Sequence, residues 1–106
     1  MLSVRQRRIL AIARKRIVNR EGWTKRVFAQ DKFGKDVLFS SSEAERFCAI
    51  GALQKAALDA GDEDPYRVAG DICRQMGRTP EEIFDLNDGW FGHRRVLKLF
   101  NDNLAK

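Results

Sequence analysis

The chain has 106 residues, with 20 Lys or Arg against 15 Asp or Glu and a formal net charge of +5 at pH 7. Its length predicts a single compact domain over 1–106, and its 43% hydrophobic and 33% charged residues are typical of a globular protein rather than a disordered one. No apolar run approaches the roughly 20 residues of a membrane span, and arginines interrupt the N-terminus where a secretory signal would be apolar. We therefore expect a cytoplasmic protein with no transmembrane segment.

The positive charge is concentrated near the N-terminus. Nine of the 20 Lys and Arg residues lie in the first 26 positions, where Glu21 is the only acid, so this block carries a formal +8. The remaining residues hold 11 bases and 14 acids, a formal −3. Because the whole positive excess lies on one segment, an anionic partner would be met there.

The first segment has the pattern of an amphipathic helix. It is predicted to run from about Ser3, as N-cap, to about Asn19. At about 100° per residue its apolar side chains share one face, and four cations share the opposite face. These cations are Arg7, Arg8, Arg14 and Lys15. The helix is therefore expected to pack by one side and to display positive charge on the other.

A short β-hairpin is predicted next, over about 25–39. Its strands would be residues 25–29 and 37–39, joined by a polar turn in which Gly34 supplies a positive φ. Ser42 and Glu45 then form a capping-box pattern that predicts a helix over about 42–60. Because this helix is apolar around most of its circumference, we expect it at the centre of the fold.

Proline residues mark the start of two further helices. Pro65 opens a helix that reaches about Met76, and Thr79 with Pro80 opens a short one that ends near residue 86. A turn at 87–89 precedes a last helix that begins at about 91 or 93 and ends at 104. The predicted fold is thus mainly α (small α+β), with four or five helices around a central apolar helix and one short β-hairpin.

The basic N-terminal segment is the main candidate for a binding site. The predicted anion-binding residues are Arg7, Arg8, Arg14, Lys15, Lys25 and Arg26. Several cations on one face can neutralise phosphates, and no base-reading motif accompanies them. We therefore expect a non-enzymatic binding or regulatory module with nucleic acid as the first candidate partner. An acidic protein surface, an anionic membrane, a solvated face, and a homo-oligomer that covers this face with the acidic stretch 59–64 stay open.

A thiol enzyme or thiol sensor is the alternative from a different class. Cys48 would be the thiol and His93 its base, and Asn87 or Asp88 would orient that base. His93 shares a helix face with apolar side chains, so it needs a partner, for which Cys48, Asp88 or a backbone carbonyl is a candidate. We favour a structural His beside a buried thiol, because no oxyanion-hole pattern flanks Cys48. No metal or other cofactor is expected, since no Cys/His cluster has zinc-finger spacing.

The loop 87–92 places two large aromatic residues, Trp90 and Phe91, between glycines. They could form an exposed tip that binds another protein, as in an inhibitor or adaptor. They could equally fold back as a hydrophobic lid, with Asn87 or Asp88 capping the last helix, and we favour the lid.

Several short motifs, taken in order, resemble a known family. A Trp-led hairpin with a central Gly precedes Arg46-Phe47-Cys48-Ala49-Ile50-Gly51-Ala52-Leu53, and Leu86-Asn87-Asp88 precedes Val96-Leu97 and Phe100. Over roughly residues 5–104 the chain resembles small uncharacterised proteins of actinobacteria and bacteriophages that form a domain of unknown function. The resemblance implies a prokaryotic or phage-infected cytoplasm and no activity. It also favours the Cys48 segment and the Asn87-Asp88 turn as parts on which the fold depends, whereas residues 89–93 depart from the family pattern.

Overall fold

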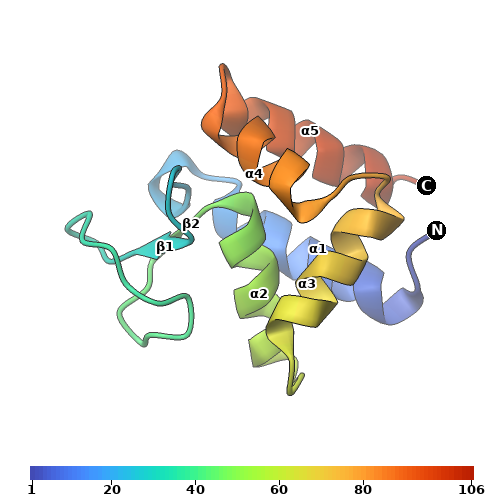
Figure 1. Cartoon of the computed structure of the whole chain (residues 1–106), viewed down its shortest axis with the longest axis horizontal. Coiled ribbons are helices and arrows are strands. Elements are labelled where there is room, and N and C mark those ends of the chain that lie inside the picture. Colours follow the sequence, from blue (N-terminus) through green and yellow to red (C-terminus); the bar gives the residue numbers. More distant parts are fainter.

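Five α-helices and one small sheet form the fold in a computed structural model that describes all 106 residues (Figure 1). The helices are α1 (Val4–Ile17), α2 (Ala49–Asp59), α3 (Pro65–Gln75), α4 (Pro80–Asp88) and α5 (Gly92–Leu104). A 3-10 turn, η1 (Arg20–Gly22), and the strands β1 (Ala29–Gln30) and β2 (Arg46–Phe47) lie between α1 and α2. The predicted mainly α class, with a small β component, is confirmed.

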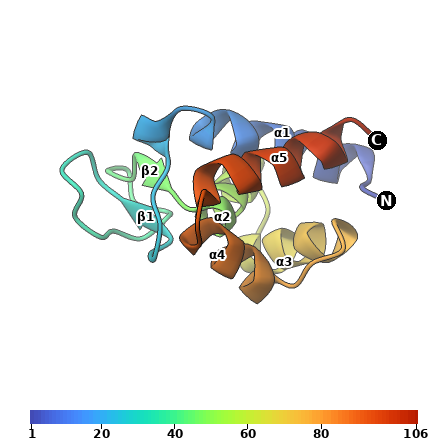
Figure 2. The same ribbon diagram turned by 90° about the horizontal axis from the view of Figure 1, so that it is seen from above.

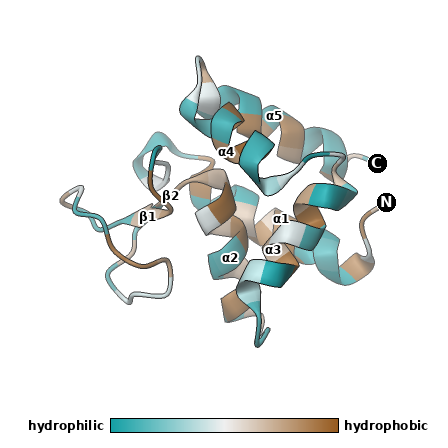
Figure 3. Cartoon of the chain, in the orientation of Figure 1, coloured by the Kyte–Doolittle hydropathy of each residue, from teal (hydrophilic) through white to brown (hydrophobic).

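The helices form two layers. Figure 2 shows α1 and α5 side by side in one layer and α3 and α4 in the other, and α2 packs against α1, α3 and α4. The dimensions of 37 × 32 × 21 Å fit this arrangement, since the axes of packed helices lie about 8–10 Å apart. Hydrophobic and hydrophilic stretches alternate along α5 (Figure 3), as expected for a helix with one buried side.

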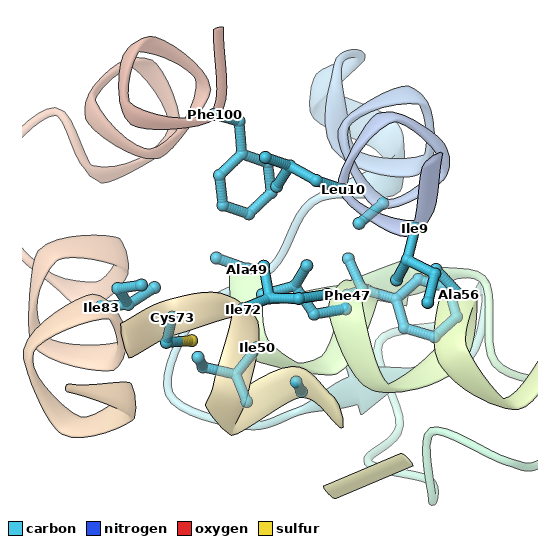
Figure 4. Packing of buried hydrophobic residues seen from close by; sticks show 14 of the residues in the cluster. Ile9, Leu10, Phe47, Ala49, Ile50, Ala56, Ile72, Cys73, Ile83 and Phe100 are labelled. Atoms are coloured by element: carbon cyan, nitrogen blue, oxygen red, sulfur yellow. The ribbon is translucent and has the colours of Figure 1, made fainter. Parts of the chain in front are cut away.

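The helix α2 supplies the centre of the core, as predicted. Eight of its 11 residues are buried, which leaves only a narrow strip in contact with water. In Figure 4, Ile9 of α1 reaches toward Ala56 of α2, while Leu10 meets Phe100 of α5. The buried face of α1 is therefore the apolar one, and its cations are left on the outside.

Side-chain caps begin α1, α3 and α4 where the sequence predicts them. Ser3 and Thr79 each form a capping box with the residue three positions on, and Asp64 caps α3. The hydrogen bond from the Thr79 backbone N–H holds the pKa of Glu82 below its usual range. The helix α4 runs to Asp88 rather than ending near residue 86, so the predicted turn at 87–89 is mostly the last turn of α4.

The predicted hairpin pairs residues 25–29 with residues 37–39, and the second of these two strands is wrong. Ala29 and Gln30 pair antiparallel with Phe47 and Arg46. Of the predicted pairing, the structure keeps an isolated bridge of residue 30 with Asp36 and a hydrogen bond from the Val37 N–H to the Ala29 carbonyl at 3.2 Å. Gly34 has the expected positive φ of 83° in the turn. The long-range pairing prevails because it buries Phe47 in the core, which the local pattern does not reveal.

The predicted start of the central helix at residue 42 is also wrong. The helix begins at Ala49, and the Ser41 hydroxyl, rather than Ser42, accepts a local hydrogen bond, from the Glu43 N–H. Cys48 is the N-cap, and its Sγ accepts a hydrogen bond from the Gly51 N–H at 3.3 Å. Residues 46 and 47 do not join the helix because they form strand β2 instead.

We predict that Gly51→Ala destabilises the fold by at least about 2 kcal/mol. A Cβ at position 51 would lie 2.0 Å from the backbone oxygen of Phe28, which is fixed because it accepts from the Cys48 N–H. Gly70→Ala in α3 is the matched control, since its Cβ would meet only the flexible end of Arg74 and alanine favours a helix. Urea unfolding measures both, and equal stability of the two variants would contradict the close approach at Gly51.

Candidate functional site

The basic residues of α1 divide into two groups by their partners. Arg5 pairs with Asp62 at 2.8 Å, and Arg16 pairs with Asp59 at 2.7 Å. Both acids lie at or just beyond the end of α2. The four cations of the predicted basic side form no ion pair: Arg7, Arg8, Arg14 and Lys15. Asp59 and Asp62 are thus engaged by the two other arginines of α1.

Two of these four cations are held in place by the end of α5. Arg7 donates from Nη1 to the carbonyl oxygens of Asn103 and Leu104, at 3.2 and 2.8 Å, and Arg14 donates from Nε to Oδ1 of Asn101 at 2.5 Å. The C-terminal carbonyls of a helix carry partial negative charge only, so the guanidinium charges are positioned rather than neutralised. Arg8 and Lys15 are exposed and make no hydrogen bond.

The helix α5 adds a further cation beside α1. Asn101 marks the edge of α5 that faces α1, and Arg94 lies on the same edge because it is seven residues, about two turns, away. Lys98 shares this edge but pairs with Asp102 at 2.9 Å, whereas Arg94 has no acidic partner. We define the α1–α5 basic face as Arg7, Arg8, Arg14, Lys15 and Arg94.

A pocket of about 390 Å³ opens between η1 and the turn that joins α4 to α5. The Arg94 guanidinium lies over the Phe91 ring, 5.5 Å from its centroid, and the Arg20 guanidinium lies 5.8 Å from the Trp23 ring. These distances are typical of cation–π contacts. His93 completes the side-chain lining, and neither arginine makes an ion pair. The pocket therefore combines free positive charge with aromatic faces.

The turn above this pocket exposes both of its aromatic side chains. Trp90 is 83% exposed and Phe91 is 63% exposed, so the predicted lid is wrong and the loop is an exposed tip. Phe91 has a left-handed backbone with φ 56°, and it occupies the N-cap of α5 without a side-chain hydrogen bond. Neither Asn87 nor Asp88 caps α5.

Asn87 instead joins three separate segments. Its Oδ1 accepts from the Ala49 N–H at 3.0 Å and from the Trp23 indole at 2.8 Å, and its Nδ2 donates to the Thr24 carbonyl at 3.0 Å. Nδ2 also reaches Asp88, which in turn accepts from the Arg26 N–H at 2.8 Å. Asn87 is fully buried and all of its hydrogen-bonding capacity is used.

The candidate thiol site is only partly assembled. Asn87 binds the N–H of Ala49, the residue after Cys48, but His93 has its Nε2 on the Ile17 carbonyl and its ring 5.1 Å from Trp23. Cys48 makes no hydrogen bond with His93, and burial raises the pKa of its thiol to about 11 although the Gly51 N–H acts in the opposite direction. Of the partners considered for His93, a backbone carbonyl is the one observed.

Lys25 and Arg26 lie away from the residues that the sequence grouped with them. Lys25 is exposed, and Arg26 is among the residues that line a different, mostly apolar pocket of about 480 Å³ with Phe28 and Phe84. Sequence reasoning missed this pocket, and it also missed Arg20 and Arg94 beside Phe91. The sequence does show Arg94 as a basic residue three positions after Phe91. Its place beside α1, however, depends on how α1 and α5 pack, which the sequence does not show.

The structure has no group of three or more His, Cys, Asp or Glu side chains placed to hold a metal ion. None of its helices combines the length and the apolar character that crossing a membrane requires.

Comparison with known families covers almost the entire chain. Residues 1–105 match a family of unknown function, DUF6197. The chain belongs to this family. The DUF6197 match confirms the membership of an uncharacterised family that the short motifs predicted. Comparisons with curated proteins and with solved structures gave no match. An activity for this DUF6197 member must therefore be argued from its own site.

We predict that Asn87→Ala lowers the free energy of unfolding by about 2–4 kcal/mol, because it leaves the Ala49 N–H and the Trp23 indole N–H without their acceptor. Asn101→Ala is the control, since Asn101 is exposed and its loss should change stability by less than about 0.5 kcal/mol. Chemical denaturation followed by far-UV circular dichroism measures both changes. An Asn87→Ala protein as stable as the parent would contradict the role of Asn87.

We predict that neither cysteine reacts quickly with a thiol reagent in the folded protein. Burial raises the pKa of Cys48 to about 11 and that of Cys73 to about 12, so only about one molecule in a thousand carries a Cys48 thiolate at pH 8. Colour release from Ellman's reagent should be slow in native buffer and rapid for both thiols in guanidinium chloride. Rapid native reaction of a Cys73→Ser variant would instead identify Cys48 as an activated nucleophile.

Proposed function

We propose that this protein is a non-enzymatic module that binds nucleic acid through the α1–α5 basic face. The proposal depends chiefly on one observation: five cations from two adjacent helices lack acidic partners, while Asp59 and Asp62 pair with Arg16 and Arg5 on the side of α1. Positive charge that is positioned but not neutralised is what a phosphate backbone recognises.

The spacing of the exposed cations suits a phosphate chain. Arg8 and Lys15 are seven residues apart, which is about 10 Å along a helix. Successive phosphates of one strand are about 3.4 Å apart along a duplex axis, so this distance spans about three of them. Arg7 and Arg14 lie one position before these residues, about 100° around the helix, and form a second row on the side that contacts α5.

A second copy of the chain fits this face less well. The acidic stretch 59–64 was the candidate cover, but Asp59 and Asp62 already form ion pairs within the chain and Asp64 caps α3. Most of the carboxylates that such an interface would use are therefore already engaged within the chain. The free thiols of Cys48 and Cys73 agree with a reducing cytoplasm, in a prokaryotic or phage-infected cell, as the setting of the proposed function.

We expect Arg8→Glu with Lys15→Glu to weaken nucleic-acid binding and to lower the slope of log affinity against log salt by about 2, because one phosphate contact is lost at each position. These residues are chosen over Arg7 and Arg14 since they make no hydrogen bond within the protein. Fluorescence anisotropy with labelled DNA and RNA across a salt series measures the change.

The matched control is Lys32→Glu with Lys35→Glu, which makes the same charge change at two exposed residues of the turn between β1 and β2. It should leave the salt slope within experimental error of the parent. Equal effects of the two double variants would show general charge attraction without a defined face. The absence of any binding at low salt would refute the proposed function.

A further inference from the structure

The exposed turn between α4 and α5 has two features that suit a contact surface. Trp90 and Phe91 leave most of their apolar surface in water, with ring centroids 6.5 Å apart. Phe91 also adopts a left-handed backbone, which is uncommon for an aromatic residue. Exposed rings held in an unfavourable conformation are typical of a contact surface.

The pocket beneath this turn has the chemistry of a nucleotide site. The rings of Phe91 and Trp23 offer faces for stacking, and the Arg94 and Arg20 guanidiniums lie beside them without ion pairs. The acids next in the chain form no ion pair with them: Glu21 has no cationic partner, and Asp88 accepts from the Arg26 N–H and from Nδ2 of Asn87. Aromatic faces interleaved with arginines are what single-stranded nucleic acids bind.

The pocket is continuous with the basic face. Arg94 belongs to both, and Arg20 follows α1 after only two residues. A strand whose phosphates lie along α1 would therefore be led to the aromatic tip at the end of the row.

We propose that Trp90 and Phe91, with the pocket lined by Arg20 and Arg94, form a stacking site for unpaired bases, so that the protein prefers single-stranded nucleic acid to duplex. This inference rests on the proposed function and adds its substrate class. Bases in a duplex are stacked on one another and present no free face to Trp90, whereas unpaired bases do. The phosphate contacts of α1 are common to both forms.

The test compares binding of a labelled single strand of about 12 nucleotides with binding of the same sequence as a duplex. Trp90→Ala should weaken single-strand binding by about tenfold and leave duplex binding within about twofold, because stacking on one aromatic residue contributes that much. Trp90→Phe should restore most of the single-strand affinity, since a smaller ring still stacks. Trp90 is 83% exposed, so its replacement should not disturb folding, and matched unfolding curves check this.

Phe33→Ala is the control for exposed aromatic surface. Phe33 is also 83% exposed and has Lys32 over its ring at 5.1 Å, but it lies in the hairpin turn, away from α1 and α5. The Phe33→Ala substitution should change neither the single-strand affinity nor the duplex affinity. If Phe33→Ala weakened single-strand binding as much as Trp90→Ala does, the proposed stacking site would be overturned.

The outcomes separate this inference from the proposed function. If single-strand and duplex binding both depend on Arg8 and Lys15 but neither responds to Trp90→Ala, the stacking site is refuted and the basic face stands. An equal loss for both forms on Trp90→Ala refutes the preference for single strands. If no nucleic acid binds, both proposals fail, and capture of a protein through the aromatic tip becomes the explanation to pursue.

Discussion

The buried carboxamide of Asn87 is the interaction on which the other parts of the structure depend. It supplies an acceptor to the first turn of α2, it holds the Trp23 indole, and it binds the backbone at Thr24. A buried polar group is stable only when it is fully paired, and here each partner comes from a segment that could not satisfy it locally. The end of α4, the start of α2 and the chain between η1 and β1 are therefore fixed relative to one another by one side chain.

This constraint also determines the shape of the candidate site. The backbone oxygen of Asn87 lies so close to Gly92 that a Cβ there would be 1.9 Å away, which keeps the turn from α4 to α5 tight. Trp90 and Phe91 lie on the exposed side of this turn. Trp23, held by Asn87, sets one wall of the pocket, and the packing of α5 on α1 brings Arg94 beside the α1 cations. The proposed binding surface is thus a consequence of how the two layers are joined.

Features encoded locally were predictable from the sequence. The apolar stripe of α1, the caps at Thr79 and Asp64, and the apolar character of α2 depend on neighbouring residues, and they predicted the helices and the position of the cations. Features that depend on distant partners were not predictable from the sequence. Strand β2 is selected by the burial of Phe47 against β1, and the start of α2 is set by Asn87, 38 residues away from Ala49. The choice between a lid and an exposed tip failed for the same reason: both were considered and the lid was favoured, since the two have identical local patterns.

The most direct test of one continuous basic and aromatic surface is an NMR titration of the ¹⁵N-labelled protein with a short single-stranded oligonucleotide. We expect the amide resonances of the exposed side of α1 and of residues 89–95 to shift together, and the indole N–H of Trp90 to shift strongly. Shifts confined to the hairpin and to the apolar pocket at Phe28, or confined to α3, would contradict the account.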